Sequence, residues 1–343
     1  MDYKQSGVDI DAGNEVVRRI RSLAQRTFTP GVLSDIGSFG GLFALDCAGL
    51  ENPVLVASAD GVGTKLRVAF MAGVHDTIGV DLVNHCVNDI LVQGARPLFF
   101  LDYLATGRLD PGVAVKIVEG LARGCRENGC ALLGGETAEM PGFYADGEYD
   151  VAGFIVGAVP RADLIDGKSI RAGDVLIGLP SAGLHTNGYS LARRIAFETA
   201  GLRVSSRVPE LGQSVGEVLL QPHRSYLEVV TPLVEARLVK GMAHITGGGI
   251  TDNLPRIVPD GLHASVDRSA WRVPELFEWL RRTGNVPLED MFRTFNMGVG
   301  LIVVCAESDE TTAMELLARA GEADAWRIGE IRAGGSGVRY VGG

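Results

Sequence analysis

Apolar runs that end in glycine recur along this chain and limit its fold more than any other feature. The runs PVLVASADG from Pro53, CALLGG from Cys130 and YDVAGFIVG from Tyr149 each have the length of one buried strand. The 46 glycines in 343 residues are about twice the usual share of roughly 7%. They are clustered and not periodic, so the sequence excludes collagen-like and low-complexity chains and predicts a globular protein with many tight turns.

Helical periodicity separates these strands. Residues 76–94 place apolar side chains on one helical face and close on Gly94, and residues 110–129 begin with Asp-Pro and stop at Gly129. An apolar run at 97–106 predicts another strand. Strands with helices between them predict an α+β or α/β first half.

A polar, turn-rich segment then restarts a strand at Val175–Leu179, so we place a domain boundary near residue 168. The predicted domains are 1–168 and 169–343: two α/β domains in an α+β chain, the second a sheet flanked by helices. We expect helices within 188–200 and 221–241, and the last residues, 325–343, predict two strands paired as a hairpin around a glycine turn.

The charge of the chain excludes several classes of partner. Its net charge is −10, whereas nucleic acids and anionic membranes require a basic surface. No apolar run approaches the roughly 18 residues of a membrane span, and the first residues are polar, so we expect a cytoplasmic protein. We expect the five cysteines to be reduced thiols, because their spacing fits neither a metal site nor a disulfide framework; they are Cys47, Cys86, Cys125, Cys130 and Cys305.

A glycine turn follows the first strand. Asp60 precedes Gly61, Gly63, Thr64 and Lys65. Glycines let backbone N–H groups converge on a phosphate, lysine adds a positive charge, and aspartate suits a divalent cation. The spacing is not that of a Walker loop, and an ordinary turn with a solvated lysine is the alternative.

The helix at 76–94 carries a polar stripe. Asp81, His85 and Asn88 are spaced to share one face, with Asp89 beside them. A solvated face would explain these residues, but a Mg²⁺ site explains the oxygen ligands better.

Glu136 follows a buried strand and the Gly134-Gly135 turn, a position where α/β sheets place ligand-binding groups. We expect Glu136 to complete a Mg²⁺ site with Asp60 and Asp89. Glu139 precedes Met-Pro, and exposure to solvent explains it equally well.

Two loops of the second half suit an anion, because each places histidine, threonine and glycine before a predicted helix. A single loop of this kind is commonly only a helix cap, whereas two favour a phosphorylated substrate. The candidate residues are Ser181, His185, Thr186 and Asn187 in one loop, His244, Thr246, Gly247, Gly248 and Gly249 in the other, and Arg293 before a later strand.

Seven motifs together resemble the phosphoribosylformylglycinamidine cyclo-ligases, the aminoimidazole ribonucleotide synthetases of purine biosynthesis. They are YKQSGVDIDAGN, DGVGTKLR, CVNDILVQGARPLFFLDYLATG, LLGGETAEMPGFY, GDVLIGLPSAGLHTNGYSL, AHITGGGITDNLPR and FRTFNMGVG. Their order and spacing match the family across essentially the whole chain. Related ATP-using enzymes, such as thiamine-monophosphate kinase, share the fold and only parts of the first motifs.

The resemblance implies ATP-dependent ring closure of formylglycinamidine ribonucleotide with Mg²⁺, and leaves open a monovalent cation such as K⁺. It implies metal and triphosphate roles for Asp60, Asp89 and Glu136, and phosphate contacts for Lys65 and the glycine turn. His185 and His244 would move a proton or face the ribose phosphate. It also implies a homodimer in which the first-domain sheets pair.

The chain departs from the family pattern at Ala59, at Asn84 and His85, and in the run PHRSY at 222–226, which contains His223. His85 would affect the metal site and His223 the substrate pocket. The alternative reading is a related small-molecule kinase or phosphotransferase. A non-catalytic scaffold is disfavoured, because Asp60, Lys65, Asp89 and Glu136 are all present.

Overall fold

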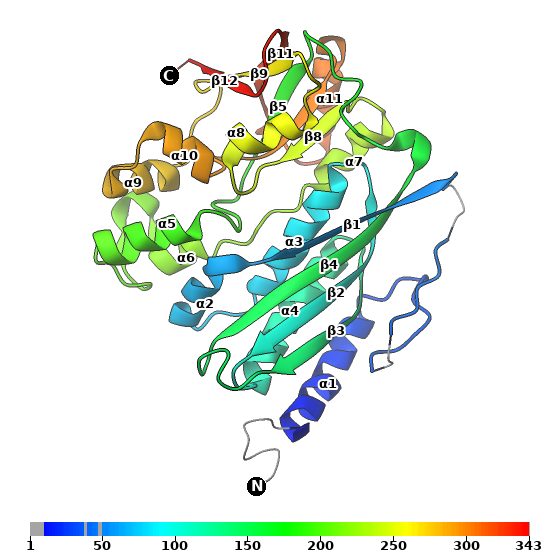
Figure 1. Cartoon of the computed structure of the whole chain (residues 1–343), viewed down its shortest axis with the longest axis vertical. Helices are drawn as coiled ribbons and strands as arrows, with labels where there is room; N and C mark the ends of the chain where they lie inside the picture. The colour runs from blue at the N-terminus through cyan, green and yellow to red at the C-terminus, as the bar shows by residue number, and fades with distance from the viewer. Residues whose placement is uncertain (1–9, 38–39, 47–49, 343) are drawn as a thin grey trace. The chain divides into compact units, whose positions relative to one another are not determined.

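The structure, a computed structural model, describes residues 10–37, 40–46 and 50–342 (Figure 1). It divides into two compact units, Met1–Ile90 with Ala95–Ala162, and Leu91–Gly94 with Asp163–Gly343. The α+β class expected from the sequence is confirmed. The division falls after Ala162, slightly before the expected position near residue 168, and the short segment Leu91–Gly94 joins the second unit.

The first unit is a sheet with helices on one face. Its strand order is β1-β4-β2-β3, antiparallel except for the parallel pair β2/β3. The strands are β1 (Pro53–Gly61), β2 (Arg96–Thr106), β3 (Ala131–Glu139) and β4 (Tyr149–Pro160). The helices are α1 (Ile10–Gln25), η1 (Gly63–Lys65), α2 (Leu66–Ala72), α3 (Ile78–Leu91), α4 (Pro111–Glu127) and η2 (Arg161–Asp163, at the division between the units).

Helices α3 and α4 lie behind this sheet in Figure 1, and two glycines let them approach closely. A Cβ atom on Gly79 would lie 2.1 Å from the backbone N of Leu121, and one on Gly120 would lie 2.4 Å from the carbonyl oxygen of Asp76. Helix α4 begins where the sequence predicts, because Asp110 caps it by accepting hydrogen bonds from the N–H groups of Gly112 and Val113. Close packing of α3 on α4 holds the polar residues of α3 in fixed positions.

The second unit contains a sheet with the strand order β12-β9-β11-β5-β10-β8. All neighbouring pairs are antiparallel except β12/β9. The strands are β5 (Val175–Pro180), β8 (Gly241–His244), β9 (Leu262–Asp267), β10 (Val299–Cys305), β11 (Trp326–Ala333) and β12 (Val338–Val341), with β6 (Arg207–Val208) and β7 (Gln213–Ser214) forming a separate small pair.

Helices surround this sheet. They are α5 (Tyr189–Arg193), α6 (Val215–Leu219), α7 (Leu227–Glu235), α8 (Gly249–Asn253), α9 (Glu275–Gly284), α10 (Leu288–Thr294) and α11 (Glu310–Arg319), with the short helices η3 (Arg194–Thr199), η4 (Pro209–Leu211), η5 (Leu254–Ile257) and η6 (Glu307–Asp309). The core of this unit joins β5, β10 and β8 to α7 and α11, as Ile177, Val303 and Leu233 illustrate. Among the described residues, no helix has the length and apolar character needed to cross a bilayer.

Two expectations for the second unit are wrong. β11 and β12 do not form a hairpin, because each pairs with a different edge of β9. The helix expected from residue 221 begins only at Leu227, and residues 221–226 form an extended loop. Period and composition identify a strand or helix, but its partner and its first residue depend on tertiary contacts.

Candidate functional site

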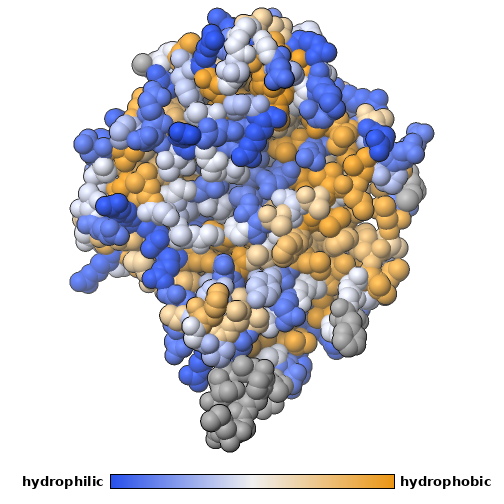
Figure 2. Space-filling model, viewed as in Figure 1, coloured by the Kyte–Doolittle hydropathy of each residue, from blue (hydrophilic) through white to orange (hydrophobic). Residues whose placement is uncertain are grey.

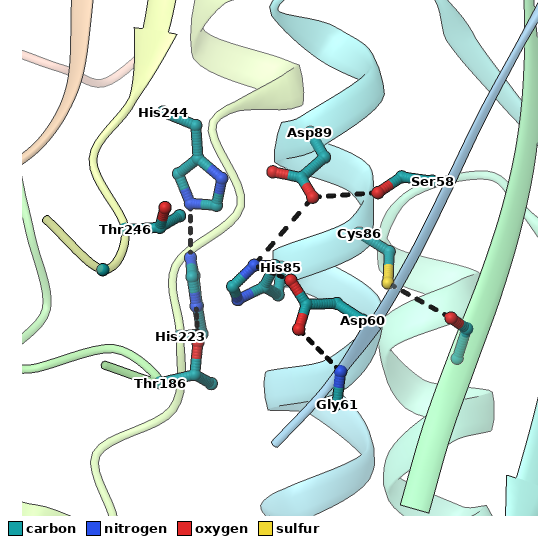
Figure 3. A network of polar contacts seen from close by, with 12 residues as sticks. Ser58, Asp60, Gly61, His85, Cys86, Asp89, Thr186, His223, His244 and Thr246 are labelled. Carbon is teal, nitrogen blue, oxygen red and sulfur yellow. Dashed lines mark hydrogen bonds and ion pairs between the residues drawn. The ribbon is translucent and has the colours of Figure 1, made fainter. Parts of the chain in front are cut away.

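The first polar group, which we call the carboxylate cluster, consists of Asp60, His85 and Asp89 of the first unit. Asp60 lies near the end of β1, and the other two lie one helical turn apart on α3. His85 Nε2 is 2.7 Å from Asp60 Oδ2 and 3.9 Å from Asp89 Oδ2. Ser58 Oγ donates to Asp89 Oδ2 at 2.9 Å (Figure 3). The imidazole is thus buried between two carboxylates that are partly exposed.

The three groups shift each other's pKa. Burial raises the pKa of Asp60, but the hydrogen bond from His85 and the N–H of Gly61 outweigh it, so this pKa lies below its usual value. Burial lowers the pKa of His85, yet the hydrogen bond to Asp60 and the charge of Asp89 bring it above its usual value. The cluster therefore favours an imidazolium between carboxylates when no other cation is bound.

We expect the pair of His85 and Asp60 to stabilise the folded protein in a defined pH window. Because the pKa of His85 is raised on folding, its contribution is complete below about pH 6.5 and disappears as the pH rises through the folded-state pKa. Because the pKa of Asp60 is lowered, its contribution persists down to below about pH 4. We expect His85→Gln to lower the free energy of unfolding by about 1 kcal/mol at pH 5.5 and by less at pH 9. The value at pH 5.5 is reduced because Asp60 is partly exposed to solvent.

Urea unfolding at both pH values measures this difference. His75→Gln is the matched control, because burial lowers the pKa of His75 and so predicts the opposite trend with pH. A His85→Gln effect that grows between pH 5.5 and pH 9 would contradict the assignment.

Lys65 lies inside the first unit and not at an open turn. After Gly61, the chain forms η1 through Gly63 and Thr64, which turns the lysine inward. Its Nζ lies 2.8 Å from Asp81 Oδ1, and both side chains are fully buried. The solvated-lysine alternative is therefore wrong, and the phosphate contact of Lys65 stays a prediction. Asp81 pairs with Lys65, and its charge also helps to raise the pKa of His85.

Asn88, predicted on the polar stripe of α3, is also fully buried. The solvated-face alternative for this helix is wrong, because His85 and Asn88 both lie beneath the surface. Their burial leaves Asp89 as the residue of α3 whose carboxylate reaches solvent beside Asp60.

The structure does not bring Glu136 to the carboxylate cluster. Asp60 lies on β1 and Glu136 on β3, at opposite edges of the sheet. The pairing register runs from Asp60 through Gly153 and Asp102 to Gly135, one residue before Glu136. Three strand spacings of about 4.8 Å separate these edges by roughly 14 Å. One metal ion within this unit cannot contact both Asp60 and Glu136, so a metal role for Glu136 stays a prediction.

The other acids near β3 have different environments. Glu139 is not turned to solvent, because its Oε1 accepts a hydrogen bond from Leu109 N at 2.8 Å. A Cβ on Gly135 would lie 2.3 Å from Asp102 Oδ1, so glycine is needed for this close approach. Burial raises the pKa of Asp102 to about 7. Gly134 lies beside Gly135 in β3, within the sheet and not in an open loop.

The second polar group, which we call the histidine cluster, consists of His185, His223 and His244 of the second unit. His223 Nε2 lies 3.1 Å from His244 Nε2, and Thr186 Oγ1 lies 3.4 Å from His223 Nδ1 (Figure 3). The rings of His185 and His223 stack with centroids 4.0 Å apart. The N–H of Ala182 donates to His185 Nε2 at 3.1 Å. All three imidazoles are buried.

The two predicted anion loops meet in the second unit. A Cβ on Gly247 would lie 3.3 Å from Asn187 Oδ1. Asn253 Nδ2 donates to the carbonyl oxygens of Gly247 and Gly249 at 3.1 and 2.8 Å, which holds the glycine turn. Gly248 has a left-handed φ of 98°, which favours glycine at this position.

The remaining predicted contacts lie near these loops. Ser181 Oγ donates to Asn296 Oδ1 at 2.9 Å, and Asn296 Nδ2 donates to the carbonyl oxygen of Gly183 at 2.8 Å. Thr246 Oγ1 lies 3.3 Å from Asn253 Oδ1. Arg293 is largely exposed and pairs with Asp252 at 3.3 Å, so its predicted substrate contact would require it to exchange that partner.

Sequence reasoning underrated four residues that position these groups. Ser58 shares the face of Asp60 in β1, and the two-residue period of a strand could have found it. Asn253 and Asn296 each hold a loop through side-chain hydrogen bonds to its backbone. His223 lies in a loop whose path is set by tertiary contacts, so no local pattern places it against His185.

The carboxylate cluster fits Mg²⁺ in part. Mg²⁺ prefers oxygen ligands and commonly uses one or two carboxylates with waters and substrate phosphates. Asp60 and Asp89 provide two partly exposed carboxylates near one point, while the neighbouring N–H groups of Gly61, Gly63 and Thr64 belong to a tight turn. These residues can hold a cation together with phosphate groups.

Known protein families and named relatives match nearly the whole chain. Residues 44–159 match the AIR synthase related protein N-terminal domain, and residues 171–342 match the C-terminal domain of the same family. A phosphoribosylformylglycinamidine cyclo-ligase of Desulfitobacterium hafniense is 56% identical over 339 residues, 99% of each chain. The enzyme of the same name from Trichlorobacter lovleyi is 55% identical over 330 residues, 96% of this chain and 94% of that protein.

Solved structures show the same fold at lower identity. Thiamine-monophosphate kinase from Stenotrophomonas maltophilia aligns with a TM-score of 0.69 and 20% identity over 96% of each chain. Hydrogenase maturation protein HypE in complex with ATP aligns with a TM-score of 0.65 and 20% identity over 92% of this chain and 86% of that one. With both domains matched and more than half of its residues shared with named relatives over nearly their full length, the chain belongs to the phosphoribosylformylglycinamidine cyclo-ligase family.

Proposed function

We propose that this protein closes the imidazole ring of formylglycinamidine ribonucleotide in de novo purine biosynthesis, using ATP and releasing 5-aminoimidazole ribonucleotide, ADP and phosphate. The observation that carries this proposal is 56% identity to a named cyclo-ligase over 99% of both chains. A cytoplasmic location suits a pathway of soluble intermediates.

The chemistry requires activation of a poor leaving group. The formyl oxygen first takes the γ-phosphoryl group of ATP, and ADP is released. The ring-forming nitrogen then attacks the formyl carbon that bears this phosphorylated oxygen. The oxygen departs as phosphate, and the nitrogen loses a proton. Asp60 and Asp89 would hold Mg²⁺, which would supply positive charge beside the phosphates; K⁺ is a further candidate cation. The N–H groups of Gly63 and Thr64 would face the triphosphate, and the buried Lys65–Asp81 pair fixes that turn from within.

The loops of the second unit bind the ribose phosphate in this proposal. Asn253 holds the Gly247–Gly249 turn by donating to two of its carbonyl oxygens. The N–H groups of Gly247 and Gly248 would then face an anion, since that of Gly249 donates to the carbonyl oxygen of Thr246. His185 and His244 lie at these loops, where they would accept the proton released on ring closure or contact the ribose phosphate. Alignment of the two reacting groups would lower the barrier to both steps.

A coupled assay tests the activity. The purified protein is incubated with ATP, Mg²⁺ and formylglycinamidine ribonucleotide, and ADP is measured beside the aminoimidazole product by diazo coupling. We expect the two products in equal amounts and only with this substrate. ADP without aminoimidazole would instead indicate a related kinase or phosphotransferase with another acceptor.

We further propose that the first-unit sheets of two copies pair across a two-fold axis. The face of the sheet away from α3 is apolar: Ala59, Phe154 and Leu101 lie in one row of the pairing register. Leu55 and Phe154 are 60% and 46% exposed. Figure 2 shows apolar side chains gathered over these strands, on the right of the view. A second copy with the same face can cover these apolar side chains.

Phe154→Asp is expected to convert this dimer to a monomer at micromolar concentration, because a carboxylate on the central row would be buried without a partner. Light scattering after gel filtration measures the mass. Leu288→Asp, an equally exposed apolar position of the second unit, serves as the control and should leave the dimer intact. A wild-type protein that elutes as a monomer would exclude the proposed pairing.

A further inference from the structure

We propose that the histidine cluster, His185, His223 and His244, binds one late first-row divalent metal ion, with Zn²⁺ and Co²⁺ as the best matches. Its three ligands are imidazole nitrogens of the second unit, whereas the carboxylate cluster of the first unit offers oxygen ligands and suits Mg²⁺. The proposal concerns binding, and its test does not use the proposed catalytic activity; a nitrogen of His185 or His244 that binds the metal would not accept the proton released on ring closure.

The geometry brings three nitrogen ligands together within one unit. The candidate ligand nitrogens of the three side chains lie within 4.8 Å of one another. The closest pair, His223 Nε2 and His244 Nε2, is separated by 3.1 Å. Two nitrogens bound tetrahedrally at 2.0–2.1 Å from Zn²⁺ lie about 3.3 Å apart, so this pair already has the required spacing. His185 stacks on His223, and its Nε2 accepts from the N–H of Ala182, so a metal ion bound through Nε2 would replace that hydrogen bond.

Proton positions also favour a cation here. Two ring nitrogens 3.1 Å apart cannot both direct a proton at each other, so at least one presents a lone pair. Thr186 Oγ1 at the far nitrogen of His223 orients that ring, in the way that partners of metal-bound histidines commonly do. A metal ion would displace the proton that these two nitrogens share and would bind both lone pairs.

The ligand set selects the metal. Imidazole nitrogen suits Zn²⁺, Co²⁺, Ni²⁺ and Cu²⁺, whereas Mg²⁺ and Ca²⁺ prefer oxygen. Three histidines with a fourth position left for water or a substrate oxygen form the open arrangement typical of zinc in enzymes. The three residues come from the loop before α5, the extended loop at 221–226 and the end of β8. One ion would therefore tie three separate segments together.

Cobalt provides the probe. Metal-free protein is titrated with Co²⁺, and the visible d–d absorption of a tetrahedral nitrogen site is followed. We expect one equivalent to bind, with at least about a 100-fold weaker association in His223→Gln, since loss of even an outer partner of a ligand weakens binding 10- to 100-fold. His263→Gln is the matched control, because His263 is a buried histidine of the same unit outside the cluster.

The outcomes separate the two clusters. Absorption that persists in His223→Gln and disappears in Asp89→Asn would overturn the proposal and place the ion at the carboxylate cluster. Absence of the absorption in the wild type would also overturn it. X-ray absorption of wild-type protein with one equivalent of Zn²⁺ gives an independent result if His223→Gln fails to fold: three imidazoles around the ion support the site, and a shell of oxygens excludes it.

Discussion

Asp89→Asn is expected to lower the turnover number by at least about 10³-fold while the protein remains folded. The change removes one charge from the carboxylate cluster but keeps an oxygen that can accept from Ser58. Loss of a single preorganised electrostatic contact at a reacting centre costs about 10²–10³-fold in other enzymes, and this carboxylate is proposed to act on both metal and phosphates.

Steady-state kinetics at saturating ATP and Mg²⁺ measures this effect. Asp146→Asn, on an exposed loop of the same unit, is the matched control and should retain full turnover. A fall in Mg²⁺ affinity parallel to the loss of turnover would locate the defect at the metal. Near-normal turnover in Asp89→Asn would remove this residue from the active site.

Lys65→Met is expected to lower the free energy of unfolding by about 3–5 kcal/mol, because it leaves the carboxylate of Asp81 buried without its ammonium partner. The double variant Lys65→Met/Asp81→Leu should recover most of this loss, since apolar side chains of similar size commonly replace a buried ion pair at little cost.

Urea unfolding of the two variants gives the comparison. Lys116→Met, at an exposed lysine of α4, controls for the general loss of one positive charge and should change stability by less than about 0.5 kcal/mol. If Lys65→Met were as stable as the control but unable to bind ATP, Lys65 would be a phosphate ligand and not a structural residue.

Local sequence patterns predicted the elements that carry the site. The stripe of α3, the glycine turn after β1 and the two glycine loops all exist where period and composition place them. These signals are local: a helix repeats every 3.6 residues, a strand every two, and a glycine turn needs only its own φ values.

The partners of those elements followed no local pattern. Glu136 and Asp60 both lie on strands of one sheet, yet the order β1-β4-β2-β3 places them at opposite edges. The two final strands looked like a hairpin, but β9 separates them. Strand order depends on packing between residues far apart in the chain, and neither hydrophobic period nor spacing contains that information.

The sequence by itself determined the family, the strands and helices, and the residue types available for chemistry. Only the tertiary structure decided how these residues are used: Lys65 is directed inward to Asp81, His85 lies between Asp60 and Asp89, and His223 stacks on His185. The physical reason is that burial and pairing of charges depend on the elements packed around them. A lysine after a glycine turn has the same local sequence whether it meets solvent, a phosphate or a buried carboxylate.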